Sequence, residues 1–290
     1  MSFKLMTDNT ADLPIQFYDD NDIGVLSLPV QVGDTVYDDY RTTDSKMFFE
    51  NMRAGTMPTT SQINPDGAKE GFLKVIEGEG IKEILYLAFS SGLSGTYNSV
   101  RIAAEELMEE RPDVKVVVID TLCAAMGEGL LVYKANQYKK QGHTLEETAE
   151  YVEKIKLNMV HIITVDDLFH LYRGGRINKA TAVVGSLVNI KPIIHVDNEG
   201  HLVSISNARG RKKSFSKLVE MMETQMGKFA SENDVIMINH GDVEEEANLV
   251  ADMIREKYGF QNIMINCIGA TIGAHTGPGL IAIFFMGEER

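Results

Sequence analysis

The 290-residue sequence contains no tryptophan and only two cysteines. Cys123 and Cys267 lie far apart in apolar surroundings, without the cysteine or histidine spacing of a zinc site, so we expect two reduced thiols. The longest apolar run, residues 280–286, is too short to cross a bilayer, and the N-terminal apolar run is too short for a signal peptide. These absences predict a cytoplasmic protein that does not insert stably into a membrane.

Basic residues are also scarce, with 28 Lys and Arg against 42 Asp and Glu and a net charge of −14. This balance argues against nucleic-acid binding, which relies on clustered positive charge. No P-loop, dinucleotide-binding or EF-hand pattern is present. Asp8, Asp120 and Asp166 fall at predicted strand ends and could ligate a metal, but capping and turn roles are favoured. We therefore expect no metal site and no cofactor.

Strand-like and helix-like segments alternate along the chain. Apolar runs predict strands at residues 3–7, 25–32, 84–89, 114–120, 161–165, 193–196, 202–205, 235–239, 262–267 and 281–286. Helical periodicity and capping residues predict helices at 43–53, 100–107, 124–140, 144–156, 167–172, 213–226 and 243–258, with others beginning after Asp12 and at Pro65. The alternation predicts an α/β fold. We expect two α/β domains, 1–158 and 159–290, with a ligand cleft between them.

The most informative segment is the run Ser-Ser-Gly-Leu-Ser-Gly-Thr-Tyr at residues 90–97. It follows a predicted buried strand and precedes a predicted helix. Small hydroxyl and glycine residues at such a turn expose backbone N–H groups, and the helix adds the positive end of its dipole. The segment is therefore suited to hold an anion such as a carboxylate, a phosphate or a reaction intermediate.

Four polar, glycine-rich loops lie between core-like runs, at residues 59–62, 90–97, 173–176 and 274–279. Because ligands in open α/β folds sit beyond the carboxyl ends of strands, we expect loops from both halves to meet at one cleft. The plainer alternative is four ordinary turns. The glycines around His275 favour close approach by a ligand or another loop.

A serine hydrolase would need a nucleophile elbow. Gly92-Leu93-Ser94-Gly95 is one residue short of the G-x-S-x-G pattern, and a distant His275 is weak evidence for a triad. Anion binding without covalent chemistry is the favoured interpretation. The one basic run, residues 209–213, suits either an acidic partner or a solvated helix start, and the same alternatives apply to Arg173 and Arg176.

Several short motifs occur in a fixed order along the chain. They are Thr60-Ser61-Gln62, the 90–97 segment, Asp120-Thr121 with Gly127-Glu128-Gly129, Arg173-Gly174-Gly175-Arg176, Ile190-Lys191-Pro192-Ile193, Ala208-Arg209-Gly210-Arg211-Lys212-Lys213 and His275-Thr276-Gly277-Pro278-Gly279. The set resembles the DegV family of bacterial fatty-acid-binding proteins, over essentially the whole chain. Each motif is weak alone, and the joint pattern is specific.

The resemblance implies a long-chain fatty acid buried between the two domains. It also implies a non-enzymatic role as the acyl-carrying subunit of a bacterial fatty acid kinase, in which a separate ATP-dependent subunit makes acyl phosphate. The fatty-acid-binding residues implied by the matching positions are Thr60, Ser61, Ser91, Gly92, Ser94, His275 and Thr276, with the exact hydroxyl among Ser90, Ser91 and Ser94 left open. The implied partner-docking residues are Arg173, Arg176 and Arg209.

The energetics fit this role. Burial of about 14 to 16 methylenes at roughly 0.8 kcal/mol each gives about 12 kcal/mol before ordering costs. Candidate apolar lining residues, each of which could instead fill the core, are Leu168, Phe169, Leu171, Ile190, Ile193 and Ile194. The alternatives are a serine hydrolase or small-molecule phosphotransferase at the same cleft, and a regulatory module that senses a lipid.

Overall fold

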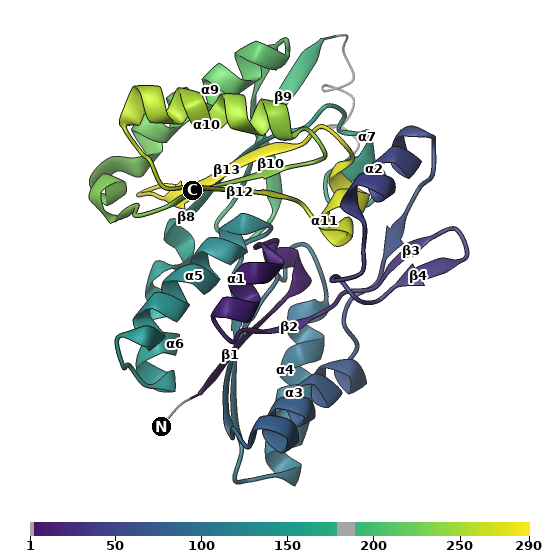
Figure 1. Cartoon of the computed structure of the whole chain (residues 1–290), viewed down its shortest axis with the longest axis vertical. Coiled ribbons are helices and arrows are strands. Elements are labelled where there is room, and N and C mark those ends of the chain that lie inside the picture. Colours follow the sequence, from purple (N-terminus) through teal and green to yellow (C-terminus); the bar gives the residue numbers. More distant parts are fainter. Residues whose placement is uncertain (1–2, 179–188) are drawn as a thin grey trace.

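The structure is a computed structural model that describes residues 3–178 and 189–290. Its first half contains a parallel four-stranded sheet in the order β2-β1-β6-β7. The strands are β1 (Lys4–Asp8), β2 (Gly24–Leu26), β6 (Glu83–Ala88) and β7 (Lys115–Asp120). Helices α3 (Pro65–Glu79) and α4 (Thr96–Glu110) lie on one side of this sheet, and α5 (Met126–Lys140) and α6 (Leu145–Ile155) lie on the other (Figure 1).

The second half contains a six-stranded sheet in the order β10-β9-β8-β13-β11-β12. Its strands are β8 (Met159–Thr164), β9 (Ile190–Val196), β10 (Leu202–Arg209), β11 (Ile236–His240), β12 (Ile263–Cys267) and β13 (Ile281–Met286). Only β11 and β12 pair in parallel, and the other neighbours are antiparallel. Helices α9 (Arg211–Met226) and α10 (Glu244–Tyr258) cover one face (Figure 1).

Local sequence signals explain where several helices begin. Helix α3 has Pro65 at its first position, and the Asn64 side chain accepts a hydrogen bond from the Gly67 amide. Helix α6 begins with a capping box in which Thr144 and Glu147 each accept from the other's backbone N–H. These starts lie where the sequence predicts them, and the predicted α/β class is confirmed.

Helix α5 joins the two sheets. It packs against β6 of the first sheet and against β8, β11 and β13 of the second. One apolar core therefore runs from the first sheet through α5 to the face of the second sheet that lies opposite α9 and α10. A smaller core lies beneath α9 and α10. Strand β8 begins at Met159, so the change of sheet falls beside the predicted domain boundary, although the core is shared across it.

The segment between β2 and α3 crosses from the first half of the fold, which we call the first unit, to the second half, the second unit. It carries β3 (Val30–Val32), β4 (Thr35–Tyr37), α2 (Ser45–Arg53) and β5 (Thr59–Thr60), and these three strands form a separate sheet in the order β4-β3-β5. In Figure 1 this segment lies beside α7 (Phe169–Arg173) and α11 (Ala270–Thr276). The remaining short elements are α1 (Ile15–Asp20) and the 3₁₀ turns η1 (Asn9–Ala11), η2 (Lys156–Asn158) and η3 (Gly227–Glu232).

Three predicted elements were wrong in this region. The single strand expected at 25–32 is two strands of different sheets, because the chain turns at Leu28, whose amide donates to Asn9 Oδ1. The polar loop at 59–62 includes strand β5. The glycine-rich loop predicted at 274–279 begins inside helix α11, where a Cβ on Gly273 would lie only 2.8 Å from the Phe49 ring. That glycine permits close packing of α11 on α2.

Asp12 also differs from its predicted role. Helix α1 begins at Ile15 after Pro14, and Asp12 instead accepts a hydrogen bond from the Gly269 amide at 2.8 Å. Among the described residues, no helix has both the length and the apolar content needed to cross a membrane.

Candidate functional site: a cavity between the two units

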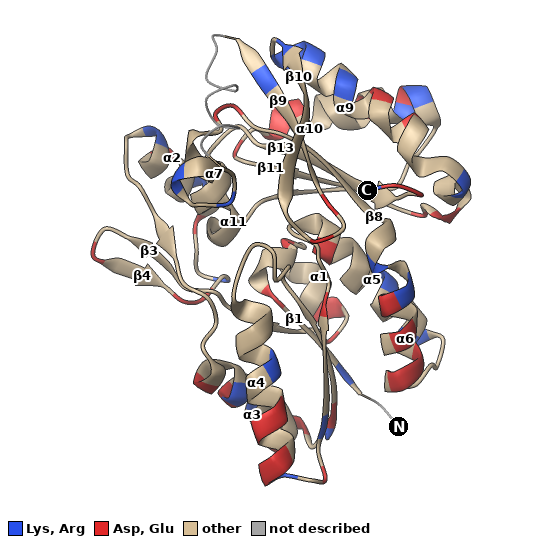
Figure 2. Cartoon of the chain, turned by 180° about the vertical axis from the view of Figure 1, so that it is seen from behind, with Lys and Arg blue, Asp and Glu red and all other residues tan. Residues whose placement is uncertain are grey.

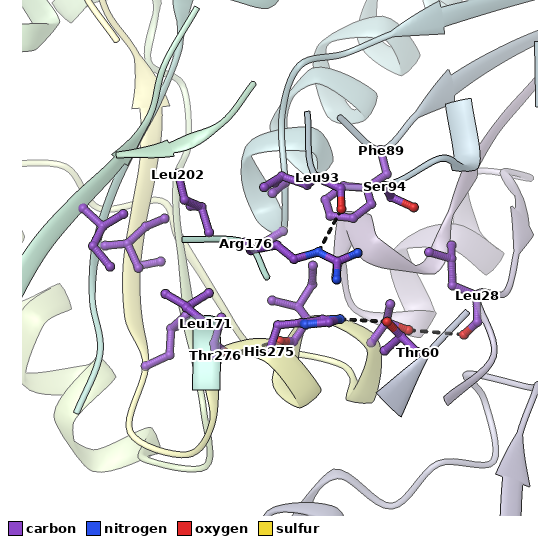
Figure 3. Close-up of a pocket in the computed structure, with 18 of the residues that line it drawn as sticks. Leu28, Thr60, Phe89, Leu93, Ser94, Leu171, Arg176, Leu202, His275 and Thr276 are labelled. Atoms are coloured by element: carbon purple, nitrogen blue, oxygen red, sulfur yellow. Dashed lines mark hydrogen bonds between the residues drawn. The ribbon is translucent and has the colours of Figure 1, made fainter. Parts of the chain in front are cut away.

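A cavity of about 220 Å³ lies where the two units meet, and residues from both line it. Most of the wall is apolar: Leu28, Phe89, Leu93, Ala124, Ala125, Ile163, Leu171, Ile194, Leu202, Ile272, Leu280, Ala282 and Phe284. The polar part of the wall consists of Thr60, Ser61, Gln62, Ser94, Arg176, Thr271, His275 and Thr276. Figure 3 shows Arg176, His275 and Thr60 close together, with Leu171 and Leu202 on one side of them and Leu28 on the other.

The polar end joins loops from both units. His275 Nε2, on α11, lies 2.7 Å from the Thr60 hydroxyl on β5 (Figure 3). Ser94, at the start of α4, lies 2.9 Å from the Thr96 hydroxyl and accepts a hydrogen bond from the Thr96 amide. Residues of all four loops that were predicted to meet, 59–62, 90–97, 173–176 and 274–279, line the cavity, and the third does so through Arg176.

His275 is a neutral imidazole near neutral pH. Burial lowers its pKa to about 4, and the positive charges of Arg176 and Arg173 act in the same direction. Its Nδ1 atom is buried without a hydrogen-bond partner among the described residues. When the proton is on Nε2, the imidazole donates to Thr60, and the Thr60 hydroxyl hydrogen is then available to a ligand.

Arg176 supplies the positive charge at this end. Its Nε donates to the Leu93 carbonyl at 3.0 Å, and its guanidinium lies between the Ser94 and His275 sides of the cavity (Figure 3). Burial lowers the pKa of Arg176 from its usual value, but an arginine stays charged at neutral pH. The sequence analysis had grouped Arg176 with the docking residues, and its place in the cavity wall was missed.

The other two arginines lie outside the cavity wall. Arg173 donates to the Pro58 carbonyl at 3.3 Å and to the Ala274 carbonyl at 3.2 Å, and so ties α7 to β5 and α11. Arg209 is exposed at the end of β10.

The predicted hydroxyl residues divide into two groups. Thr60, Ser61, Ser94, His275 and Thr276 line the cavity, whereas Ser91 and Gly92 do not.

Ser91 is exposed, and its amide donates to Asp120 Oδ1 at 3.1 Å. Gly92 packs on the Gly200 backbone, where a Cβ would lie 2.8 Å from the Gly200 carbonyl oxygen. The Ser90 hydroxyl donates to that same carbonyl at 2.9 Å. The first half of the 90–97 segment therefore holds the β9–β10 hairpin in place, and only its second half faces the cavity.

Comparison with known proteins gives the family. The model described as "Uncharacterised protein, DegV family" matches residues 2–288. The chain belongs to the DegV family. A DegV domain-containing protein of Clostridium perfringens (strain 13 / Type A) is 44% identical over 290 residues, covering 99% of this chain and 98% of the relative.

Two solved structures share the fold. A DegV family protein from Thermus thermophilus, whose structure is described as fatty acid binding, superposes with a TM-score of 0.87 at 28% identity, covering 99% of this chain and 100% of the other. The fatty acid kinase B3 protein of Streptococcus pneumoniae, loaded with linoleic acid, gives 0.85 at 25% identity with the same coverage. The predicted resemblance to the DegV family is confirmed.

A hydrolytic site finds no support in this DegV chain. The His275 imidazole bonds to Thr60, whereas Ser94 bonds to Thr96, so the serine and histidine do not form a nucleophile–base pair.

The three aspartates considered as metal ligands each accept a hydrogen bond from a different partner. Asp8 accepts from the Phe89 amide, Asp120 from the Ser91 amide and Asp166 from the Lys191 ammonium. No group of metal-ligating side chains occurs in residues 3–178 and 189–290.

The predicted apolar lining was only partly right. Leu171 and Ile194 line the cavity, and Leu168 is buried beside it in the core. Ile193 lies on the opposite face of the second sheet beneath α9, because neighbouring residues of a strand point to opposite faces. Phe169 is 47% exposed, and Ile190 is not part of the wall.

The sequence analysis missed the residues of β13 that line the cavity. Leu280, just before β13, and Ala282 and Phe284 on it face the cavity, but residues 280–286 are all apolar, so no alternation in the sequence marks the residues that do so. Leu28 and Phe89 carried no signal either, because they precede or follow short strands whose partners lie far away in the sequence.

Proposed function

We propose that this protein binds one long-chain fatty acid in the cavity, with the carboxylate at the polar end and the hydrocarbon tail against the apolar wall. The observation that carries the proposal is the pairing of two kinds of surface in one cavity: thirteen apolar residues line the wall together with hydroxyls, an imidazole and an arginine, and His275 lies 2.7 Å from the Thr60 hydroxyl. The fatty-acid-binding titles of the Thermus and Streptococcus structures support it.

The tail supplies most of the binding free energy. Each buried methylene contributes roughly 0.8 kcal/mol, so a long acyl chain contributes about 12 kcal/mol before the cost of ordering. A larger hollow of about 730 Å³ lies over β2 and α3, but ion pairs such as Lys4 with Asp22 and Glu79 line it. Such a lining does not suit a hydrocarbon chain.

The polar end fixes the orientation of the acid. A buried carboxylate requires hydrogen-bond donors and a positive charge. Thr60 and Ser94 can each offer a hydroxyl hydrogen, and Arg176 offers the charge. Thr276 acts differently, because its hydroxyl donates to the Ile272 carbonyl at 3.1 Å and has no second hydrogen to give.

The carboxylate end is also the accessible end. Ser61, Gln62 and Gly95 line the polar end and are exposed, whereas Ala282 and Phe284 are fully buried. An acid bound in this orientation presents its carboxylate to a second protein. We propose that this protein is a carrier without catalytic activity of its own, working in the cytoplasm with a separate ATP-dependent kinase subunit that forms the acyl phosphate.

A basic surface is the proposed docking site for that kinase. Arg209 is exposed at the end of β10, and Lys212 and Lys213 follow at the exposed start of α9. In Figure 2 the ribbon of β9 and of α9 carries basic positions, coloured blue, at this end of the second unit. Arg173, whose guanidinium donates to the Pro58 and Ala274 carbonyls, would act by holding α7 beside the accessible end of the cavity.

Transfer can be separated from binding by experiment. We expect the protein loaded with oleate to yield acyl phosphate, trapped as the hydroxamate, when ATP and the kinase subunit are added. Arg209→Glu should slow this transfer at unchanged oleate affinity, while Arg101→Glu, at an exposed arginine on α4, should not. Equal rates for both variants would remove Arg209 from the docking surface, and a loaded protein that is never phosphorylated would refute the carrier role.

A further inference from the structure

One side of the cavity wall carries a small residue between two large ones. Leu280 lies just before β13, Ala282 and Phe284 follow at a spacing of two on the strand, and all three line the cavity. We infer that Phe284 sets the longest acyl chain that the cavity accepts, with Ala282 as the recess that lets the chain reach it. This inference rests on the proposed function and adds to it the determinant of chain length.

The direction of the cavity follows from exposure. His275 and Thr276 end α11, four residues before β13 begins, and they line the cavity together with the exposed Ser61 and Gly95. Ala282 and Phe284 are 1% and 0% exposed. A chain that enters with its carboxylate at the polar end therefore runs along β13 toward Phe284.

The far end is closed behind Phe284. The Phe284 ring meets the His161 imidazole edge-on, with 5.3 Å between ring centroids and 86° between planes. His161 Nδ1 lies 2.8 Å from the Met159 carbonyl, and Nε2 accepts from the Ala124 amide at 3.2 Å. With hydrogen bonds at both nitrogens, this imidazole cannot swing aside to admit more chain.

Helix α5 seals the same end from the other side. A Cβ on Gly127 would lie 2.0 Å from His161 Nε2, so the start of α5 lies directly against this imidazole. Ala124 and Ala125, which precede α5, are part of the cavity wall. Phe284, His161 and these alanines together form the floor.

Ala282 determines the depth that can be reached. It pairs across the sheet with Ile163, and Ile163 pairs with Ile194, so a methyl group stands in a row with two branched side chains. All three residues line the cavity. A larger residue at 282 would project into the path between Leu280 and Phe284.

If Phe284 limits the chain length, the affinity should depend on the number of methylenes in a defined way. Each added methylene should raise affinity roughly fourfold while it is still buried, from about 0.8 kcal/mol per methylene. The gain should stop at the chain length whose terminal methyl reaches Phe284. Longer acids should bind no better, or more weakly, because a rigid floor leaves the added methylene in water or forces strain.

The test measures dissociation constants of saturated acids from decanoate to docosanoate for the wild-type protein and three variants. Phe284→Leu should move the break in the profile to longer acids, and Ala282→Val should move it to shorter ones. Phe285→Leu is the matched control, because Phe285 is equally buried on the same strand but faces the core beneath α9 and α10. Its break should stay at the wild-type length.

The outcomes distinguish a failure of this inference from a failure of the proposed fatty-acid binding. If the wild type binds the acids and the Phe284→Leu and Phe285→Leu profiles coincide, the role of Phe284 is refuted while the binding function stands. A wild type that binds none of the acids refutes both. Ala282→Val does not remove core volume, so its shift to shorter acids supports the inference even if Phe284→Leu lowers stability.

Discussion

At the scale of single residues, Thr60 is the side chain on which carboxylate recognition most depends. Its hydroxyl lies 2.7 Å from His275 Nε2 and is part of the cavity wall, and it accepts from the imidazole when the proton is on Nε2. We expect Thr60→Val to weaken oleate binding by about 1.5–3 kcal/mol, the value of a hydrogen bond to a charged group, since valine keeps the shape and removes the donor. Isothermal titration at neutral pH measures the change.

The neighbouring Thr59 provides the control for this substitution. It lies on the same short strand but is exposed and outside the cavity wall. Thr59→Val should therefore leave the affinity unchanged. If both variants bind oleate as tightly as the wild type, the carboxylate does not lie at Thr60.

The sequence identified the residue types at the polar end but not their orientations. Ser91 and Ser94 look equivalent in a glycine-rich turn, yet only Ser94 faces the cavity, because the Ser90 hydroxyl anchors the first half of the turn to Gly200. Arg173 and Arg176 differ in the same way. Which member of such a pair reaches a ligand depends on contacts with segments distant in the sequence, and the motif does not contain them.

At the scale of elements, the start of α5 is strained. Ala125 has φ 52° and ψ −146°, a conformation that only glycine adopts readily. It is held there because the Ala124 amide donates to His161 and the Met126 amide donates to Asn239. Ala125→Gly should raise the free energy of unfolding by about 1 kcal/mol, through relief of this strain.

Ala124 provides the comparison. It has no left-handed conformation, so Ala124→Gly should lower the free energy of unfolding by roughly 0.5–1 kcal/mol. Urea unfolding of both variants measures the difference. A loss of stability in Ala125→Gly equal to that in Ala124→Gly would contradict the assignment of strain.

Helix α5 also carries a buried acid that we assign as protonated. Burial and the nearby Asp8 hold the pKa of Glu128 well above its ordinary value. The Thr7 hydroxyl has one hydrogen and lies 2.9 Å from the Leu87 carbonyl and 2.8 Å from Glu128 Oε1, so a protonated Glu128 can donate to Thr7 while Thr7 donates to Leu87. A glutamine amide can make the same donation.

Glu128→Gln should therefore leave the free energy of unfolding near neutral pH unchanged or raise it, because glutamine makes the donation without binding a proton, while Glu128→Ala should lower it. Because the folded pKa is raised, the wild type loses stability as pH rises from the ordinary glutamate pKa to the folded pKa, and Glu128→Gln should show a flatter pH dependence over that window. Urea unfolding across that range measures both effects. A glutamine variant as unstable as the alanine variant would show that the carboxylate is needed in its charged form.

Most elements could be predicted because each strand or helix carries its own period and caps, as at Asn64-Pro65 and Thr144. The failures fell where tertiary contacts override the local pattern. Helix α11 was hidden because Gly273 indicates a loop in the sequence, whereas in the fold it permits contact with Phe49.

At the scale of the whole molecule, the resemblance to a family provided more than periodicity could. The alternation of elements predicted an α/β protein, and the ordered motifs predicted the DegV fold. Neither predicted that α5 would pack on both sheets, or that Leu28 and Phe284 would share a wall with Leu93. Such contacts depend on the register of strands and the crossing of segments, which no single segment encodes.

At the scale of the whole molecule, our central proposal is that the apolar cavity between the two units holds a fatty acid with its carboxylate at Thr60, Ser94, His275 and Arg176. Native mass spectrometry of protein purified from bacteria tests it most directly. The account predicts a mass increase of one long-chain fatty acid, or one equivalent of added oleate taken up by delipidated protein. Protein that carries no acid and takes up neither oleate nor palmitate would contradict it.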